Sequence, residues 1–430
     1  MKYPSVEELY GLFLKHPFIS TDTRNITKDS IFFALKGANF NANQFAADSF
    51  EKGASFAVID EEKYYAGGCI LVHDVLKTMQ LLATHHRRMM KIPIIAITGS
   101  NGKTTTKELT AAVLAKKYRT LFTQGNLNNH IGVPLTLLKL TGKHQIAVIE
   151  MGANHQGEIA ELCKIAEPGY GIITNIGKAH LEGFGGPEGV IKAKSELYHF
   201  IKSADGTLFV NADDRLLMGL SEGIKRIRYG SSPDAECRGI SDKESFLAKG
   251  AIIDDGIEME IKSRLAGQFN FCNMLAAACI GFHFGLSLRQ IKAAIEEYEP
   301  LNNRSQLVDT GKNKVWIDTY NANPTSMKLA TENFAQSPGK GKVLILGDMF
   351  ELGAESVKEH QELAIFIDNQ KVFDDVHLVG TEFEKVQTSA NKFKTLDEFI
   401  RWIKTNPIKE KYILLKGSRG MQMERALEYL

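Results

Sequence analysis

The amino-acid sequence predicts an α/β protein of three domains, and three observations lead to this prediction. Short apolar runs alternate with helix-like segments through most of the chain, a pattern typical of parallel strands covered by helices. A glycine-rich segment at residues 98–105 joins one of these runs to a helix. The chain also has 430 residues, which exceeds the size of one ordinary hydrophobic core. We expect the domains to span residues 1–85, 86–302 and 303–430.

The charge balance and hydropathy of the chain argue against several classes of partner. There are 52 Lys and Arg residues against 51 Asp and Glu residues, so electrostatics give no reason to expect nucleic acid or an anionic membrane as partner. The N-terminal residues lack the apolar core of a signal peptide. Residues 275–286 form the least polar stretch, which is too short to span a bilayer and predicts a buried helix. The five cysteines form no C-x-x-C pair and are typical of reduced core residues. We therefore expect a cytoplasmic protein without a membrane span, and we expect it to be a monomer.

The first domain is expected to mix short strands and helices. Turn-forming residues occur at 36–39, where Lys36-Gly37-Ala38-Asn39 interrupts the apolar pattern. Residues 75–90 have a helix-like pattern and lead into the next apolar strand. We expect a small α/β domain in this part of the chain.

The central domain begins with a predicted phosphate-binding loop. Residues 92–97 are typical of a buried strand, and residues 107–114 are typical of a helix. The glycines between them allow backbone N–H groups to approach phosphate oxygens closely. Lys103 would reach the β- and γ-phosphates, and the Thr104 hydroxyl would bind Mg²⁺. The spacing, G-x-x-G-K-T, is shorter than the common G-x-x-x-x-G-K-[ST]. We expect ATP to contact Gly99, Ser100, Asn101, Gly102, Lys103, Thr104 and Thr105.

Polar side chains follow two further predicted strands of the central domain. The apolar runs at 146–149, 171–174 and 207–210 predict a mainly parallel sheet, and such sheets bind ligands at the carboxyl ends of their strands. Glu150 ends the first of these strands and is placed to hold Mg²⁺ directly or through water. His180 lies beyond the second strand, in a loop rich in Gly and Asn.

The remainder of the central domain contains a predicted helix and a predicted hairpin. Residues 190–200 form the helix, which carries Lys192 and Lys194; on composition alone both are expected to be solvated. Alternating polarity over residues 236–262, around Asp254-Asp255-Gly256, predicts the hairpin with an Asp-Gly turn.

The third domain restarts the alternation of strands and helices after the loop at 299–303. Its predicted strands are 315–318, 343–346, 376–379 and 412–415. The pattern predicts a Rossmann-like α/β domain, but no G-x-G-x-x-G segment is present. The sequence therefore gives no basis for predicting a dinucleotide site there.

Several of these segments together resemble one family, the Mur ligases. The resemblance rests on the 99–105 loop, Glu150-Met151-Gly152, and Thr174-Asn175 followed by Ala179-His180-Leu181. Mur ligases are ATP-dependent amide-forming enzymes of peptidoglycan precursor synthesis, related to folylpolyglutamate synthetase. The resemblance implies that Thr104 and Glu150 hold one Mg²⁺ and that His180 helps to hold a second.

The same resemblance changes the interpretation of one lysine. Lys194 lies at the family's spacing from His180, where several members carry a carbamylated lysine that supports the magnesium. The resemblance therefore implies a catalytic group at Lys194, together with Lys103 and His180, and leaves Lys192 on the surface. Carbamylation of Lys194 is a hypothesis at this stage.

Three further segments indicate which acceptor the chain uses. Residues 123–136, 318–327 and 346–353 resemble the members of the family that add D-alanyl-D-alanine, and no D-N-P-R-type motif for a single amino acid is present. The resemblance implies ATP-dependent joining of D-Ala-D-Ala to UDP-N-acetylmuramoyl-tripeptide through an acyl phosphate. A ligase adding a single diamino acid, a folate polyglutamylase and, from another class, a nucleotide-driven switch remain alternatives.

The resemblance also implies contacts for each substrate. Asn273 would lie at the adenine, although Phe269 replaces the usual His of that stretch; Arg304 would contact ATP, and Asp318 would bind the ribose. Tyr320 and Asn321 would lie near the adenine. Expected contacts of the UDP-substrate are Ser20, Asp22, Arg24, Lys36, Gly37, Asn126, Asn128 and Asn129. Expected contacts of the acceptor are Asn323, Lys416, Ser418 and Arg419, although the charges of the last segment would equally suit the acyl phosphate.

Overall fold

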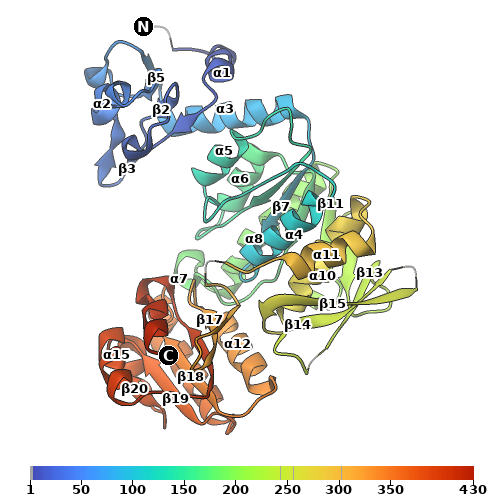
Figure 1. Cartoon of the computed structure of the whole chain (residues 1–430). Coiled ribbons are helices and arrows are strands. Elements are labelled where there is room, and N and C mark those ends of the chain that lie inside the picture. The colour runs from blue at the N-terminus through green and yellow to red at the C-terminus, as the bar shows by residue number, and fades with distance from the viewer. Residues whose placement is uncertain (1–2, 243, 255, 302) are drawn as a thin grey trace.

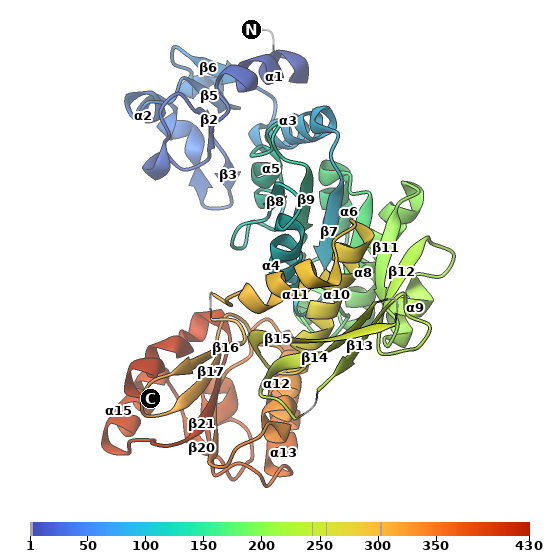
Figure 2. The same cartoon turned by 45° about the vertical axis from the view of Figure 1, so that its right-hand side comes forward.

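A computed structural model describes residues 3–242, 244–254, 256–301 and 303–430. The N-terminal and C-terminal parts lie at opposite ends of the molecule, with the central part between them in both views (Figures 1 and 2). The predicted α/β class and the arrangement in three parts are confirmed. Within the described residues, no helix is both long and apolar enough to cross a membrane.

The N-terminal part is a small parallel sheet with helices and short turns around it. The strand order is β1-β2-β5-β6, and a separate two-stranded hairpin, β3-β4, lies beside it. The bounds are α1 Val6–Lys15, β1 Ile19–Ser20, β2 Ile31–Phe33, β3 Lys36–Gly37, β4 Phe40–Asn41, α2 Ala46–Glu51, β5 Phe56–Ile59 and β6 Cys69–Leu71. Strand β2 is buried along its whole length, so it lies at the centre of this small core.

One long helix, α3 (Val75–Met90), connects the N-terminal and central parts. It begins at Asp74, whose carboxylate accepts a hydrogen bond from the N–H of Lys77. The helix packs against α1 on one side and against α5 and α6 of the central part on the other. The predicted division after residue 85 therefore falls inside a continuous helix.

The central part contains a parallel sheet extended by an antiparallel hairpin. Strands β8-β9-β7-β10-β11-β12-β13 are parallel neighbours, and β14 and β15 continue the sheet in antiparallel pairing. The strands are β7 Ile94–Thr98, β8 Thr120–Phe122, β9 Ile146–Glu150, β10 Tyr170–Ile173, β11 Thr207–Asn211, β12 Arg226–Gly230, β13 Cys237–Ser241, β14 Leu247–Asp254 and β15 Ile257–Ala266. The predicted hairpin is confirmed as β14-β15, although Asp255 of its turn lies outside the described residues.

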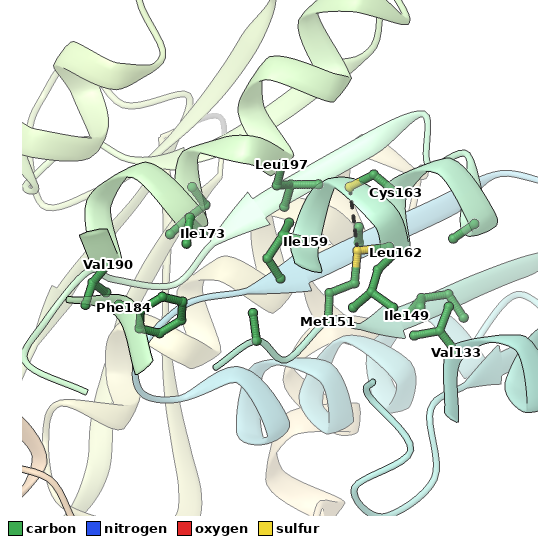
Figure 3. Close-up of a cluster of buried hydrophobic side chains, with 14 of the residues drawn as sticks. Val133, Ile149, Met151, Ile159, Leu162, Cys163, Ile173, Phe184, Val190 and Leu197 are labelled. Carbon is green, nitrogen blue, oxygen red and sulfur yellow. Dashed lines mark hydrogen bonds between the residues drawn. The ribbon is translucent and has the colours of Figure 1, made fainter. Parts of the chain in front are cut away.

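Helices cover this sheet on both faces. They are α4 Lys103–Ala115, α5 Gly132–Leu137, α6 Glu158–Ala166, α7 Leu181–Phe184, α8 Pro187–Ser203, α9 Arg215–Leu220, α10 Asn270–His283 and α11 Leu288–Glu297. On one face, side chains of β9, β10, α6 and α8 form the buried cluster of Figure 3, in which Cys163 Sγ lies 3.8 Å from Met151 Sδ. Phe184 and Val190 belong to this cluster, so the segment that carries His180 and Lys194 is anchored in the core.

The C-terminal part is a second, mostly parallel sheet. Strands β17-β21-β18-β19-β20 are parallel, and β16 pairs antiparallel with β17. The elements are β16 Gln306–Asp309, β17 Lys314–Asp318, α12 Pro324–Gln336, β18 Lys342–Gly347, α13 Ser356–Asp368, β19 Asp375–Val379, α14 Thr381–Glu384, β20 Asn391–Phe393, α15 Leu396–Thr405 and β21 Tyr412–Lys416. A bridge between Leu265 and Gln306 joins β15 to β16, so the two sheets are continuous. The predicted boundary at residue 302 lies outside the described residues.

Candidate functional site

A cavity of about 760 Å³ lies between the central and C-terminal parts. Its central wall is formed by lining residues that precede residue 303, and its C-terminal wall by those that follow. The structure brings most of the predicted site residues to this cavity. They are Ser100, Asn101, Gly102, Lys103, Thr104, Thr105, Asn126, Asn128, Asn129, Glu150, His180, Asn273, Arg304, Asp318, Tyr320, Asn321, Asn323, Lys416 and Arg419.

The glycine-rich loop connects β7 to α4 in a conformation that requires glycine at two positions. Gly99 has φ +143°, and a Cβ there would lie 2.0 Å from Thr174 Oγ1. Gly102 has φ +79°, and a Cβ there would lie 2.8 Å from Asn273 Oδ1. A side chain at either position would therefore collide with the neighbouring strand end or helix.

Lys103 is folded back onto this loop. Its Nζ donates hydrogen bonds to the carbonyl oxygens of Gly99, at 2.7 Å, and Ser100, at 3.2 Å. Burial lowers the pKa of Lys103, and the charge of Glu150 opposes that shift. The ammonium group is thus held against the carbonyl groups of the glycine-rich loop.

Glu150 presents a carboxylate beside the loop, at the end of β9. Its Oε1 accepts hydrogen bonds from Asn128 Nδ2, at 2.8 Å, and Thr104 Oγ1, at 3.3 Å. Its Oε2 is buried and has no hydrogen-bond partner within the described residues. A hydroxyl and an unsatisfied carboxylate oxygen are ligands that Mg²⁺ accepts, with phosphate oxygens and water completing its shell. The donor set therefore fits Mg²⁺, although no group of three or more His, Cys, Asp or Glu suited to a metal occurs among the residues described.

A second lysine near Glu150 was missed by sequence reasoning. Lys107 of α4 is completely buried, and its Nζ lies 3.7 Å from Glu150 Oε2 and 3.6 Å from Glu108 Oε1. A Lys-Glu pair within a helix is typical of a solvated face, so the sequence carries no signal for this position. The ammonium group of Lys107 faces Oε2 of this carboxylate, whereas the hydroxyl of Thr104 contacts Oε1.

Lys194 is buried in α8, whereas Lys192 is exposed. Burial, reinforced by the nearby charge of Lys103, lowers the pKa of Lys194 to about 7. Its Nζ lies 5.2 Å from the centre of the Phe184 ring. A substantial share of this amine is therefore neutral near pH 7, which composition alone did not predict.

His180 directly precedes α7 and has a left-handed backbone, with φ 51°. Its Nδ1 lies 2.5 Å from Oε2 of Glu351, which belongs to the loop after β18. The contact with His180 lowers the pKa of Glu351. Glu351 also lines the cavity, so it is a site residue that sequence reasoning missed. Its only signal was its place in the 346–353 segment, which indicated the acceptor but in which no single residue was given a role.

The C-terminal wall contains a buried ion pair and a stack of cationic and aromatic side chains. Lys416, at the end of β21, is 2% exposed and pairs with Asp318 at the end of β17. Lys416 also donates to the carbonyl oxygen of Asn321, at 3.1 Å. The guanidinium of Arg304 lies 3.4 Å above the Tyr320 ring. Lys416, which was predicted to contact the acceptor, and Asp318, which was predicted to bind the ribose, thus form an ion pair with each other.

Contacts between the two parts keep the cavity walls together. Asn323 caps the N-terminus of α12, and its Nδ2 donates to Asn101 Oδ1 of the phosphate-binding loop at 2.8 Å. The backbone N–H of Lys178 donates to Thr325 Oγ1 at 2.9 Å. Lys178 Nζ also lies 2.6 Å from Glu359 of α13. Helix α12 therefore begins against the glycine-rich loop of the central part.

The remaining predicted residues lie outside the cavity lining. Gly99 and Lys194 are positioned behind the central wall, and Ser418 is buried with its Oγ accepting from the N–H of Phe350 at 3.0 Å. Ser20, Asp22, Arg24, Lys36 and Gly37 all lie in the N-terminal part. Asp22 is held by Arg24, whose side-chain and backbone hydrogen bonds lower the pKa of its carboxyl to about 2. Their contacts with a uridine nucleotide stay predictions.

The chain is similar to proteins of one family over most of its length. A family model described as the Mur ligase middle domain matches residues 97–281, and one described as the Mur ligase, glutamate ligase domain matches residues 303–419. The chain is 35% identical over 434 residues to the UDP-N-acetylmuramoyl-tripeptide--D-alanyl-D-alanine ligase of Bacillus subtilis (strain 168). That alignment covers 96% of this chain and 92% of the relative.

Solved structures of the same kind are similar to the whole fold. A crystal structure of MurF from Acinetobacter baumannii superposes with a TM-score of 0.86 at 31% identity, covering 95% of this chain and 92% of that one. The crystal structure of MurF ligase from Thermotoga maritima in complex with ADP superposes with a TM-score of 0.85 at 25% identity, covering 96% of both chains.

Proposed function

The chain belongs to the Mur ligase family, and we propose that it joins D-Ala-D-Ala to UDP-N-acetylmuramoyl-tripeptide while converting ATP to ADP and phosphate. The observation that carries this function is the cavity itself. It unites a phosphate-binding loop from the central part with charged groups from a C-terminal part. The similarity to ligases with this acceptor extends over nearly the full chain, which disfavours a diamino-acid ligase, a folate polyglutamylase or a nucleotide switch.

An amine does not displace an oxygen of a free carboxylate, because that oxygen is a poor leaving group. The reaction must therefore first convert it into a better one. A carboxylate oxygen of the tripeptide attacks the γ-phosphorus of ATP, ADP leaves, and an acyl phosphate forms. The amine of the dipeptide then attacks the carbonyl carbon, and phosphate leaves with the oxygen that the carboxylate contributed. Lys103 exchanges its two carbonyl partners for phosphate oxygens and neutralises their developing charge. The walls position the two substrates and exclude water from the acyl phosphate.

We propose two Mg²⁺ ions in this cavity. Thr104 and Glu150 would hold one, and His180 would help to hold the other after releasing Glu351. When bound, such ions neutralise phosphate charge and orient the transferred group. The unsatisfied Oε2 of Glu150 supports the first of these assignments.

Lys194 is proposed to react with carbon dioxide. Its neutral amine would attack the carbon of CO₂ and lose a proton, which converts a buried cation into a carbamate anion beside the phosphate-binding loop. The lowered pKa of Lys194 supports this proposal because only the neutral amine is a nucleophile. The resulting negative charge would support a metal ion near Lys103.

The remaining residue roles are those that the resemblance to the Mur ligase family implies. We propose that Asn273, Tyr320 and Asn321 surround the adenine, Asp318 the ribose, and Arg304 the phosphates. Residues 1–85 would bind the uridine nucleotide, with Asn126, Asn128 and Asn129 contacting the same substrate from the central wall. Residues 86–302 would bind ATP, and residues 303–430 the acceptor through Asn323, Lys416, Ser418 and Arg419. We also propose that the enzyme works in the cytoplasm as a monomer.

One assay tests the proposed function. Phosphate release is measured with ATP, Mg²⁺ and UDP-N-acetylmuramoyl-tripeptide, with D-Ala-D-Ala, lysine or diaminopimelate as the added acceptor. We expect release to require the dipeptide. Release driven by a single diamino acid would contradict the choice of acceptor, and hydrolysis indifferent to every acceptor would favour a nucleotide switch.

A further inference from the structure

We propose that Glu351 binds the ammonium group of the dipeptide acceptor, an inference that rests on the proposed function. Glu351 lines the cavity from the C-terminal wall and reaches across to the central wall, where its Oε2 meets His180. No other ion pair of this carboxylate occurs within the described ranges. Its side chain is 58% exposed, so Oε1 is accessible to a ligand in the cavity.

The loop that carries Glu351 is fixed by buried contacts of the residues just before it. The carboxylate of Asp348 accepts hydrogen bonds from the N–H groups of Glu382, at 2.9 Å, and Phe383, at 3.0 Å. The N–H of Met349 donates to Nε2 of the buried His360 at 3.0 Å. Because the residues just before it are held by these contacts, the position of Glu351 is set by the fold of the C-terminal part.

Among the carboxylates of the C-terminal wall, Glu351 is the one available to bind a cationic group. Of the residues described, only Asp318 and Glu351 bring a carboxylate to this wall of the cavity. Asp318 is neutralised by the buried Lys416. Among the residues described, the one ion-pair partner of Glu351 is the imidazole of His180. A substrate ammonium arriving on the acceptor side therefore has one carboxylate available.

A neighbouring loop supplies the complementary charge. Arg419 follows β21, the strand that pairs with β18, and both loops leave the same end of the sheet. The N–H of Phe350 donates to Ser418 Oγ at 3.0 Å, and the N–H of Ser418 donates to the carbonyl of Asp348 at 3.2 Å. The carboxylate of Glu351 and the guanidinium of Arg419 are thus presented by two loops that are bonded to each other. A dipeptide with a free ammonium at one end and a carboxylate at the other matches this pair of charges.

The position of Glu351 also suits the chemistry. The nucleophilic nitrogen must reach a carbonyl carbon that is next to the transferred phosphate. His180 lines the same cavity as Lys103 and Glu150, and Glu351 contacts His180. An ammonium held at Glu351 therefore waits on the phosphate side of the C-terminal wall, ready to attack once it has lost a proton to solvent.

The test compares Glu351→Gln with Glu355→Gln in the full-length enzyme. Glu355 ends the short 3-10 helix Gly353–Glu355 that follows this loop, pairs with Lys358 on the surface, and is not among the described residues that line the cavity. We expect Glu351→Gln to raise the KM for D-Ala-D-Ala by about tenfold or more, because it removes a charge-assisted hydrogen bond. The KM values for ATP and UDP-tripeptide should stay within about twofold of wild type, as should all three values in Glu355→Gln.

A partial reaction and an acceptor analogue separate binding of the ammonium from other roles. Acyl-phosphate formation without dipeptide, trapped by borohydride reduction, should proceed at the wild-type rate in Glu351→Gln. D-lactoyl-D-alanine, in which a hydroxyl replaces the ammonium, should inhibit the wild-type enzyme weakly. Its inhibition of Glu351→Gln should be at least as strong. Equal loss of acyl-phosphate formation and ligation, or an unchanged KM for the dipeptide, would overturn the proposal.

Two controls keep the result interpretable. Failure of the proposed function would be visible in wild type, as phosphate release that does not depend on the dipeptide. If Glu351→Gln does not fold, as judged by thermal unfolding, Glu351→Asp retains the charge on a shorter side chain. That variant should raise the KM for the dipeptide less than tenfold while leaving acyl-phosphate formation intact, and loss of both would contradict the proposal.

Discussion

The two walls of the cavity are built in different ways. The central wall is assembled inside one sheet, where the phosphate-binding loop, Glu150 and Asn128 contact one another over short distances. The C-terminal wall is assembled from loops after separate strands, and its charges are held by partners such as Lys416 with Asp318. Polar contacts such as Asn323 with Asn101, Thr325 with Lys178 and His180 with Glu351 join the two walls, and a bridge between β15 and β16 makes their sheets continuous.

This difference indicates a division of labour. A wall that is preorganised within one sheet can stabilise the charge of the transferred phosphate without rearrangement. A wall built from loops after separate strands can move to admit the acceptor and return before the amine attacks. Variants of the central wall should therefore affect phosphate chemistry, and variants at the junction should affect substrate binding.

The largest effect is expected at Lys103. Replacing it with Met removes the ammonium that we propose to face the phosphates, so we expect kcat to fall by about 10²–10³-fold. The matched control is Lys192→Met, which removes an exposed lysine from α8. Acyl-phosphate formation without acceptor is the measurement, and a Lys103→Met enzyme that forms it at the wild-type rate would refute this role of the central wall.

The next effect is expected at Lys194. Lys194→Ala should lower kcat by about tenfold to a hundredfold, because it removes the group that we propose to support a metal ion. Added acetate or formate should restore part of the activity if a carbamate is the active form. Full activity in the variant without any additive would contradict the proposal.

The pKa of Lys194 leads to a prediction on pH. Because this pKa is lowered to about 7, the neutral amine that reacts with CO₂ becomes more abundant as the pH rises through 7. Enzyme depleted of CO₂ should therefore regain activity on addition of bicarbonate, and should regain more of it at pH 8 than at pH 6. A recovery that is the same at both values, or greater at pH 6, would count against carbamylation.

The smallest effect is expected at the junction of the walls. Thr325→Ala removes the acceptor for the N–H of Lys178, a loss of about 1 kcal/mol or about fivefold in an equilibrium. We expect the KM for ATP to rise by about this factor while kcat changes less. A fall in kcat as large as that of Lys103→Met would show that the junction takes part in the chemistry.

The same difference explains what the sequence could predict. The central wall follows from local patterns: an apolar strand, glycines at required positions, and a polar residue at the next strand end. The contact between His180 and Glu351 joins residues far apart in the chain and depends on how two parts of the molecule pack. Lys107 looks solvated beside Glu108, yet it is buried because α4 turns it toward Glu150.

Two other features limit what the sequence can predict: some strands are very short, and burial of a residue on a helix depends on which way the helix faces. Strands β1, β3, β4 and β8 have two or three residues, too few for a periodic pattern to be visible. The strands predicted at 146–149, 207–210 and 343–346 are confirmed because each is a long apolar run buried on both faces. Burial of Lys194 could be inferred only from resemblance, since α8 carries both an exposed and a buried lysine.

The most direct test of the account follows one oxygen atom. UDP-N-acetylmuramoyl-tripeptide is labelled with oxygen-18 in its reacting carboxylate and is ligated to D-Ala-D-Ala, and the released phosphate is analysed by mass spectrometry. An acyl phosphate formed between the two walls predicts that one labelled oxygen is transferred to the phosphate in each ligation. Amide formation with unlabelled phosphate would contradict the account.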